Sequence, residues 1–370
     1  MSYQMCSRCV MDNQSDDTII FDQNGYCNYC TDAISSMPRR YFPNEEGKEK
    51  LDKLISQLKM EGKGKKYDCL MGISGGLDSS YLAYLGYQYG LRILAIHIDD
   101  GFDTPIAVEN IKNIGKSCSV DIIYEHPNKE QYLDLTRAFI KAGLPNIAIP
   151  QDNLIFAYLY KHAKKYGVKY FLSGGNFALE SILQKGNTHD AFDKKHIYDI
   201  NNKFGTKPIS NLQITSNFQR KIRDQIFYKI NEVRPLDYID YNKNKAINEL
   251  AEFCGFDYYG GKHYESILTI FMQTYYLPKK FKVDKRNSHL SSLIVSGQMT
   301  REEALKELKK PIPLYDEKHI NQIIENLLDL FQMTREEFDG IMMTAGKQHN
   351  EYKTSSWKYI SKIAKTVRRY

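Results

Sequence analysis

The stretch CLMGISGGLDSS, Cys69–Ser80, decides the fold class of this 370-residue chain. It passes from a short apolar run into a loop with two glycines and then into a helical pattern, which is typical of a buried strand followed by a helix. Gly75 and Gly76 let backbone amides approach a phosphate closely, and the helix dipole favours its negative charge. Asp78 would be unfavourable beside bare phosphate, so it indicates a magnesium ion between them.

Apolar runs and helical patterns alternate around this stretch. The expected strands are 69–73, 93–98, 121–125 and 169–172, and the expected helices are 79–88, 104–118, 129–141 and 153–166. This alternation predicts an α/β fold with a doubly wound parallel sheet covered on both faces. Ligands of such sheets lie at the carboxyl ends of the strands. Because polar residues follow three of these strands, at 74–80, 97–102 and 173–176, we expect one site there.

The glycine loop matches neither the Walker A pattern nor the dinucleotide fingerprint. Residues 74–79 resemble the SGGxDS signature of the ATP pyrophosphatase (PP-loop) superfamily, which has the adenine nucleotide alpha-hydrolase-like fold. The resemblance implies that ATP binds here and that AMP passes to a substrate oxygen; a plain turn at a helix start is the alternative. The implied ATP contacts are Ile73, Ser74, Gly75, Gly76, Leu77, Asp78, Ser79, Ser80, His97, Asp99, Asp100, Gly174, Gly175 and Asn176.

Glu180 follows the fourth strand end by a few residues and has two interpretations. It is a candidate second carboxylate on the magnesium ion, opposite Asp78. Equally, it fits an ordinary first-turn acid that complements a helix dipole.

Four of the seven cysteines form two Cys-x-x-Cys pairs, Cys6/Cys9 and Cys27/Cys30. Their spacing across a hairpin at Asn24-Gly25 predicts a structural zinc site with four thiolate ligands. A redox role fits less well, because no helix is expected directly after either pair. The remaining cysteines are expected to act as small apolar core residues; they are Cys69, Cys118 and Cys254.

Composition places limits on the class of protein. No run of about 18 apolar residues and no secretory leader are evident, so we expect a cytoplasmic protein without a transmembrane segment. The net charge of +6 comes from residues 346–370, which hold seven Lys or Arg and one Glu, and the rest of the chain is neutral. A protein with a large nucleic-acid surface usually spreads positive charge over it, so no nucleic-acid partner is expected.

The predicted organisation has five segments. Two capping boxes, Thr300/Glu303 and Thr334/Glu337, each predict a helix in a C-terminal helical subdomain. The last segment has an apolar stripe with adjoining lysines from Trp357 onward, which predicts an amphipathic helix that docks on its own domain, on a partner or on an anionic membrane. The boundaries are a zinc knuckle at 1–46, a helix and linker at 47–66, the PP-loop domain at 67–240, a substrate-binding and helical region at 241–345, and the basic helix at 346–370.

The order of these motifs resembles the N-acetyl sugar amidotransferases of the WbpG/PseA type. The resemblance runs from Cys6 to about Leu305 and includes SGGNFALES at 173–181, GGKHYES at 260–266, and YYLPKKF at 275–281. It implies that the acetamido oxygen of a nucleotide sugar or nonulosonic acid attacks ATP, and that ammonia then displaces AMP to give an amidine for bacterial surface glycans. It also implies a HisH/HisF-like glutaminase pair as ammonia source.

Such chemistry needs cations for the phosphates and exclusion of water. The expected catalytic residues are Asp78, Lys262, His263, Glu265, Lys280, Lys285 and Arg286, with ATP, Mg²⁺ and structural Zn²⁺ as cofactors. Tyr264, Tyr275, Tyr276 and Phe281 are expected to form walls for a sugar. A solvated basic loop is the alternative for the lysines, and His263 with Glu265 also permits a general acid/base role.

Two other functions stay open at this stage. A tRNA thiolation enzyme can combine a zinc knuckle with the same loop, but it would need cysteines near the loop to carry sulfur or hold an iron–sulfur cluster. A non-catalytic nucleotide-binding module that regulates a partner would share the loop without turning over ATP.

Overall fold

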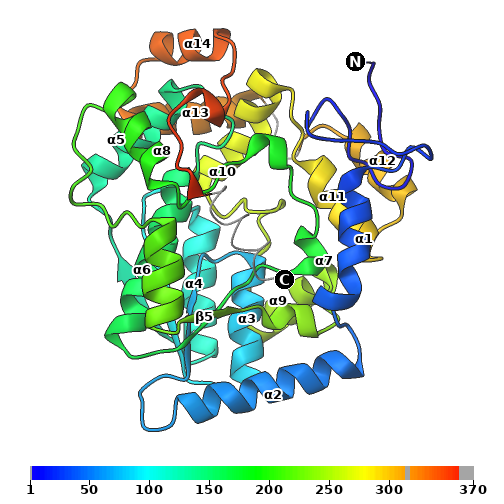
Figure 1. Ribbon diagram of the computed structural model, residues 1–370, viewed down its shortest axis with the longest axis vertical. Helices are drawn as coiled ribbons and strands as arrows, with labels where there is room; N and C mark the ends of the chain where they lie inside the picture. Colours follow the sequence, from blue (N-terminus) through cyan, green and yellow to red (C-terminus); the bar gives the residue numbers. More distant parts are fainter. Residues whose placement is uncertain (1, 313–316, 358–370) are drawn as a thin grey trace.

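A parallel sheet forms the centre of the molecule. The computed structural model describes residues 2–312 and 317–357, and the strand order of its sheet is β3-β2-β1-β4-β5 (Figure 1). The strands are β1 (Cys69–Gly72), β2 (Ile93–Ile98), β3 (Asp121–Glu125), β4 (Tyr170–Leu172) and β5 (Asn231–Val233). The chain runs outward from β1 to one side and then returns to β4 on the other. A ligand site is therefore expected between the ends of β1 and β4.

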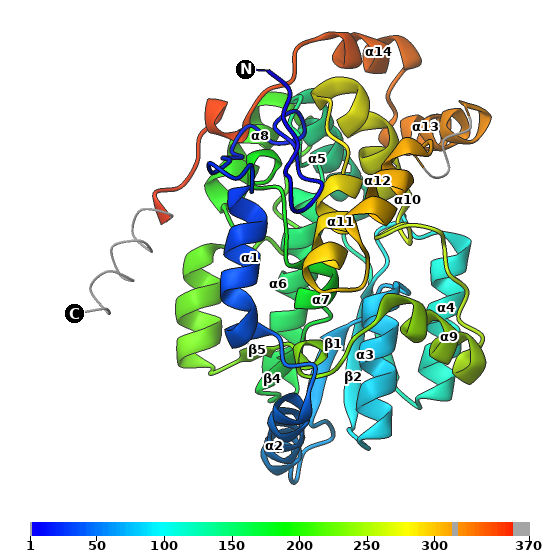
Figure 2. The same cartoon turned by 90° about the vertical axis from the view of Figure 1, so that its right-hand side faces the viewer.

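Helices cover both faces of the sheet, which confirms the predicted α/β class. Alternate strand residues belong to opposite cores: Met71 and Ala95 pack on one face, and Leu70 and Leu94 on the other. α6 (Ile149–Lys165) contacts β1, β2 and β4 on the second face. The first face carries α3 (Leu77–Gln88), α4 (Pro105–Ser117) and α9 (Lys243–Cys254), and Figure 2 shows these helices opposite α6.

The middle of the chain contains elements that sequence periodicity did not predict. They are α8 (Lys194–Phe204), the π-helix η2 (Gln219–Phe227) and β5. By contrast, α5 (Lys129–Lys141) has the bounds that were predicted, and the short helix α7 (Phe177–Glu180) follows β4. β5 is short and begins with two polar residues, so it lacks the apolar run by which the other strands were recognised. Its place in the sheet comes from pairing with β4.

The N-terminal segment folds around its cysteines, followed by α1 (Asn28–Arg40) and α2 (Glu45–Glu61). The predicted hairpin is reduced to an isolated antiparallel bridge between Phe21 and Cys27, with Gly25 at a φ of 74° in the turn. The expectation that no helix follows the second pair was wrong, because Cys27 is the N-cap of α1. A polar N-cap thiol begins a helix in the way that Ser or Asp does.

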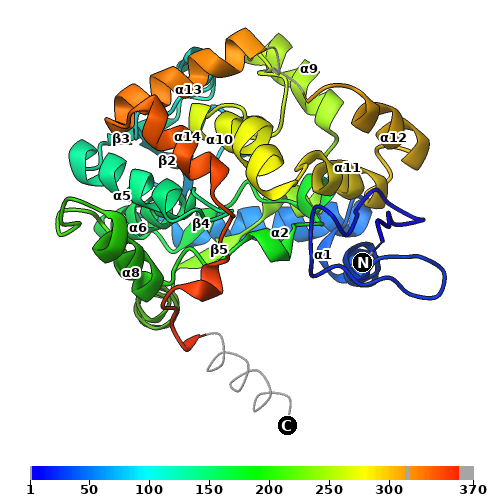
Figure 3. The ribbon, with the colours of Figure 1, turned by 90° about the horizontal axis from the view of Figure 1, so that it is seen from above.

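The C-terminal helices lie over the carboxyl end of the sheet (Figure 3). The reciprocal capping box of Thr300 and Glu303 is present, and Thr334 accepts a bond from the Glu337 amide. These helices are α10 (Ile267–Phe271), η4 (Met272–Phe281), α11 (Arg286–Val295), α12 (Arg301–Lys309), α13 (Glu317–Phe331) and α14 (Arg335–Met343). The predicted domain boundaries stay predictions, since α11 contacts both α1 and α7. The predicted amphipathic helix after Trp357 lies outside the described residues.

Gly75 gives a test of the loop. Its φ is 72°, and a Cβ there would lie 2.2 Å from the carbonyl oxygen of Ala107. Gly75→Ala should lower the free energy of unfolding by about 2–5 kcal/mol, because left-handed strain and overpacking add. Gly64 has a φ of 77° with nothing within 4 Å of its Cβ position, so Gly64→Ala should cost only about 1–2 kcal/mol. Equal costs in denaturant titrations would contradict the packing argument.

Candidate active site

The glycine loop is held in place by side chains on both sides. Ser74 Oγ lies 3.2 Å from Ser79 Oγ and accepts a 3.2 Å bond from the Gly76 amide. Tyr259 accepts a 2.8 Å bond from the Leu77 amide through its hydroxyl. Gly76 is the N-cap of α3 and supplies no side-chain cap. The start of α3 therefore offers its dipole to an anion.

A largely buried lysine joins the loop to the next strand end. Lys262 Nζ lies 2.7 Å from Asp78 Oδ2 and 3.0 Å from Glu180 Oε1. Asp78 Oδ1 accepts bonds from Tyr241 Oη at 2.7 Å and from Asn176 Nδ2 at 3.2 Å. Burial opposes the charge on Lys262, but the two carboxylates raise its pKa above the ordinary value. The site thus holds a permanent cation beside the start of α3.

The predicted magnesium pair is brought together, but around an ammonium group. A metal ion shared by Asp78 and Glu180 would need the position of Lys262 Nζ, and the other oxygen of Asp78 already has two donors. Magnesium also requires oxygen ligands in near-octahedral geometry. The residues present therefore do not fit a magnesium ion in this arrangement, and Glu180 serves as a partner of Lys262.

Two histidines beside Lys262 hold opposite charge states. His263 Nε2 lies 3.5 Å from Glu180 and Nδ1 3.7 Å from Glu265; although burial disfavours its charge, these carboxylates raise its pKa to about 9. The His289 ring centroid lies 6.5 Å from that of His263. Burial and the nearby cation of Lys285 lower the pKa of His289 well below its ordinary value. At neutral pH the site contains an imidazolium and a neutral imidazole.

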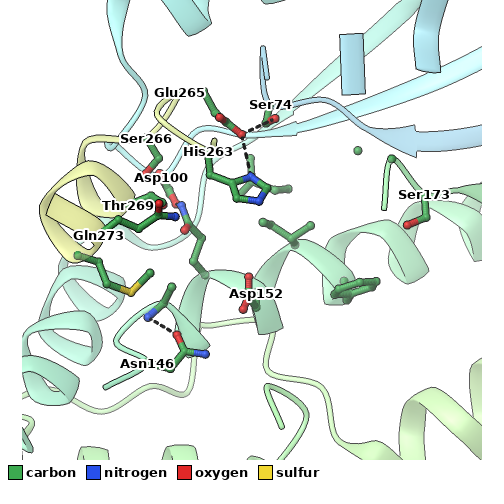
Figure 4. Close-up of a pocket in the computed structure, with 18 of the residues that line it drawn as sticks. Ser74, Asp100, Asn146, Asp152, Ser173, His263, Glu265, Ser266, Thr269 and Gln273 are labelled. Atoms are coloured by element: carbon green, nitrogen blue, oxygen red, sulfur yellow. Dashed lines mark hydrogen bonds and ion pairs between the residues drawn. The ribbon is translucent and has the colours of Figure 1, made fainter. Parts of the chain in front are cut away.

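Two cavities meet at these residues. The strand-end cavity, about 480 Å³, is lined from the ends of β1, β2 and β4 and from α6 (Figure 4). The lysine cavity, about 500 Å³, is lined by the glycine loop, Lys262, Tyr258 and Tyr264. Both volumes are in the range of small-molecule sites. The shared lining residues are Ser74, Gly174, His263, Glu265, Gln273 and His289.

Of the three expected ATP contacts at the end of the second strand, His97 and Asp100 line the strand-end cavity. His97 Nδ1 donates to the Ile73 carbonyl at 2.9 Å, and Nε2 lies 3.0 Å from Asp103. Asp100 accepts bonds from Tyr132 and Gln151, and burial raises its pKa to about 6. Asp99 instead pairs with His126 outside this cavity.

Other predicted ATP contacts line the same space. Ile73, Ser74 and Gly174 line the strand-end cavity, whereas Ser79 and Gly175 line the lysine cavity. Ser80 is buried with no hydrogen-bond partner for its hydroxyl. Their roles in binding stay predictions.

The sequence did not single out two residues on these walls. Asp152, on α6, lines the strand-end cavity, and desolvation raises its pKa to about 6 although the charge of His263 opposes this shift. His289, on α11, was not among the predicted site residues. Asp152 lies in the first turn of α6, one residue before the predicted start of that helix. An acidic residue next to the expected helix start was the signal that could have identified it. His289 follows Lys285, the N-cap of α11, by four residues, a spacing that brings two side chains to the same side of a helix.

Two of the predicted catalytic cations have structural partners instead. Lys280 Nζ donates to the carbonyls of Ile341 at 2.6 Å and Thr344 at 2.7 Å, at the end of α14, and it lines neither cavity. Arg286 touches the lysine cavity, but its guanidinium binds Asp284 and donates to carbonyls at the end of α12. Cations near helix C-termini stabilise the orphan carbonyls there. Lys280 is therefore a poor candidate for catalysis in this arrangement.

Lys285 differs from these two. It lines the strand-end cavity, and burial lowers its pKa to about 8. Among the expected aromatic walls, only Tyr264 lines a cavity. Tyr276 is fully buried and donates to the Leu144 carbonyl, because η4 turns this face into the core.

The four paired cysteines converge into one cluster. Their sulfur atoms all lie within 4.8 Å of one another, with Cys6–Cys30 at 3.7 Å and Cys9–Cys27 at 3.6 Å. Zinc–sulfur bonds of about 2.3 Å in a tetrahedron place the sulfurs about 3.8 Å apart, so the donors fit a structural zinc ion. The Arg301 guanidinium donates to the carbonyls of Cys6 and Cys9 and joins the cluster to α12.

The fold and site define an α/β protein in which a strand–loop–helix unit suited to binding phosphate lies beside a largely buried lysine. Residues 265–364 match the family described as LPS biosynthesis protein WbpG-like, C-terminal domain. The chain is thus similar to the WbpG-like proteins over its C-terminal part, and the predicted resemblance is confirmed there. A search of the curated proteins finds no match.

Several solved structures match at low identity. One is the NH3-dependent NAD synthetase from Campylobacter jejuni subsp. jejuni NCTC 11168, with 13% identity and a TM-score of 0.31 over 56% of this chain and 93% of that chain. Another is the NMN synthetase from Francisella tularensis, with 13% identity and a TM-score of 0.29 over 56% and 92%. The U34-tRNA thiolase NcsA from Methanococcus maripaludis has 15% identity and a TM-score of 0.31 over 88% and 98%.

Within 2–312 and 317–357, no helix has the length and apolar character that crossing a bilayer requires.

The cysteine cluster predicts a metal dependence. Cys9→Ser should lose the bound zinc ion and lower the melting temperature, because metal binding contributes directly to folding of such sites. Cys254 lies outside the cluster and bonds only its own helix, so Cys254→Ser should keep the metal. Metal analysis and thermal melts of both variants provide the measurement; a full zinc content in Cys9→Ser would contradict the assignment.

His263 predicts a pH dependence of stability. Its folded pKa of about 9 exceeds the unfolded value of about 6.5, so protonation contributes stability that is complete below about pH 6.5 and is lost as pH rises through about 9. The difference in unfolding free energy between wild type and His263→Gln should therefore narrow across this window. Glu265→Gln should lower the pH at which this stabilisation is lost, because Glu265 is one of the carboxylates that raise the pKa of His263. A difference independent of pH would refute the charged state.

Proposed function

We propose that this protein is an ATP-dependent enzyme that adenylates the acetamido oxygen of an N-acetyl sugar and replaces it with ammonia-derived nitrogen. The product is an acetamidino sugar for bacterial surface glycans. The observation that carries the proposal is the meeting of two ligand-sized cavities at the glycine loop, with Lys262 fixed beside the start of α3. The WbpG-like C-terminal domain supports the sugar substrate.

The strand-end cavity suits the nucleotide. Ile98, Phe156 and Leu159 give it apolar walls for a base, and Asp100 and Gln151 give polar groups near them. The phosphates then reach the start of α3, where the helix dipole and Lys262 stabilise negative charge. Pyrophosphate is the leaving group, so its negative charge develops next to the start of α3 and Lys262.

The lysine cavity suits the sugar. Tyr258 and Tyr264 line it, and aromatic rings pack against the apolar faces of sugars while water is excluded. The amide oxygen attacks the α-phosphorus of ATP, and pyrophosphate leaves. The resulting imidate carries a good leaving group, AMP, on its carbon.

The second step requires removal of a proton. Ammonia adds to the imidate carbon and becomes positively charged, and one N–H proton must pass to a base before AMP departs with its oxygen. His289 lies at the junction of both cavities, and its lowered pKa leaves a ring nitrogen unprotonated and free to accept this proton. His263 is charged and can stabilise the AMP phosphate.

The proposed source of ammonia rests on the resemblance and on the residues that line the two cavities. A HisH/HisF-like glutaminase pair would supply it, since neither cavity has a cysteine among its described lining residues to act as a glutaminase nucleophile. The same observation disfavours tRNA thiolation, because Cys69 is buried in β1 and the lining residues include no thiol to carry sulfur.

The test uses purified full-length protein with ATP, an ammonium salt and a panel of acetamido sugars. The expected result is release of AMP and pyrophosphate that needs both sugar and ammonia, with a product whose mass reflects exchange of O for NH. Binding of ATP without pyrophosphate release for any sugar would favour a non-catalytic module and refute the enzyme.

Lys262 gives the matching prediction. Lys262→Met should reduce pyrophosphate release by about 10²–10³-fold, because a positioned charge at the leaving group is lost. Lys279 is exposed and lies outside both cavities, so Lys279→Met should keep the wild-type rate. Equal rates for wild type and Lys262→Met would contradict the proposed role of Lys262 in stabilising the phosphates.

A further inference from the structure

The π-helix η2 and the residues at its ends bury a charged side chain and expose apolar ones. The only buried residue of η2 is an aspartate, Asp224, whose side chain is 0% exposed. The large apolar side chains of this segment instead face outward. Their exposed fractions are 61% for Phe218, 39% for Ile222, 59% for Ile226, 75% for Phe227 and 38% for Tyr228. A helix that packs on a core normally does the reverse.

The inward aspartate is held by cations. Lys164 Nζ, from α6, lies 3.0 Å from Asp224 Oδ1, and Arg223 binds both carboxylate oxygens at 2.8 and 3.0 Å. Arg220 and Gln225 donate to the Tyr160 hydroxyl on the same helix. These contacts fix which face of η2 meets α6, at the edge of the molecule (Figure 2). The outward face is therefore a fixed feature of the fold.

The apolar residues form one continuous ridge. Phe218, Ile222 and Ile226 are spaced four residues apart and Phe227 lies five beyond Ile222, and residues four and five apart lie on one side of a helix with i→i+5 bonds. Phe218, Ile226 and Phe227 keep more than half of their surface exposed, whereas Ile222 and Tyr228 are partly covered. Exposed apolar groups gathered in this way mark an interaction surface, whereas single ones are ordinary.

Lysines predominate among the exposed charges around the ridge. Lys221 and Lys229 are exposed on η2 and just after it, and Lys169 donates to the Tyr228 carbonyl at 2.8 Å. Of the nearby acids, Asp224 is buried against cations and Glu232 pairs with Arg220 at 3.2 Å, while Asp190 accepts a bond from Asn217 beside Phe218. The surface thus combines aromatic and branched apolar groups with lysines.

We propose that the η2 ridge, residues 218–229, docks on an anionic lipid surface. Helices that lie in a bilayer interface combine Phe and aliphatic groups with Lys and Arg, and anionic headgroups attract the basic residues. Lysine is depleted from protein–protein interfaces, which argues against a protein partner for a ridge flanked by lysines. A single helix gives weak, reversible attachment. This proposal is independent of the proposed reaction.

The test is vesicle flotation with the full-length protein. Wild type should float with vesicles of phosphatidylcholine and phosphatidylglycerol, and less with phosphatidylcholine alone or at high salt, because screening weakens the headgroup attraction. Phe227→Glu should reduce binding about tenfold or more, since burial of a phenyl ring is lost and a charge of the wrong sign is added. Met343 is 88% exposed on α14, so Met343→Glu should bind as wild type does.

Three results would overturn the proposal. Wild type that fails to float with anionic vesicles excludes lipid docking. Equal binding of Phe227→Glu and wild type, with both folded by circular dichroism, moves the lipid contact elsewhere. Wild type that stays unbound yet forms a dimer lost in Phe227→Glu assigns the ridge to a second copy of this chain.

Discussion

The ammonium group of Lys262 is the interaction on which the site depends. It joins Asp78, at the start of α3, to Glu180, at the end of α7, and so connects the glycine loop, the β4 end and the segment before α10. Charges removed from water are costly unless paired and hydrogen-bonded, and here each carboxylate also has other partners. This network therefore fixes the geometry of both cavities together.

The same network sets the charge states of the groups around it. Glu180 and Glu265 favour the protonated form of His263, whereas Lys285 and burial favour the neutral form of His289. Two imidazoles about 6.5 Å apart thus have opposite chemical roles. α11 carries His289, and the cysteine cluster braces that helix: the Val10 amide donates to Ser291 Oγ, and Asn287 donates to Asp12.

Asp224 plays a comparable part at the edge of the molecule. A buried aspartate paired with Lys164 and Arg223 decides which face of η2 points inward, and the apolar residues are left outside as a consequence. In both places a buried acid with cationic partners determines how an element presents its remaining side chains. The first case shapes an enclosed site and the second an exposed surface.

The sequence alone determined the parallel α/β core, because strands buried on both faces are continuous apolar runs and the intervening helices have a clear period. Cys-x-x-Cys spacing similarly identified the metal-type cluster. Short-range pattern could not reveal β5, whose polar residues gain strand structure only by pairing with β4.

Tertiary structure decided how the charged residues are used. The sequence grouped Lys262, Lys280 and Arg286 as equivalent cations, and the fold separated them: Lys262 meets two carboxylates, whereas Lys280 and Arg286 bond carbonyls at helix ends. It also placed Lys262 where a magnesium ion was expected. A charge acquires its role from the partners that surround it, and for Lys262 one of those partners, Asp78, lies 184 positions away in the chain.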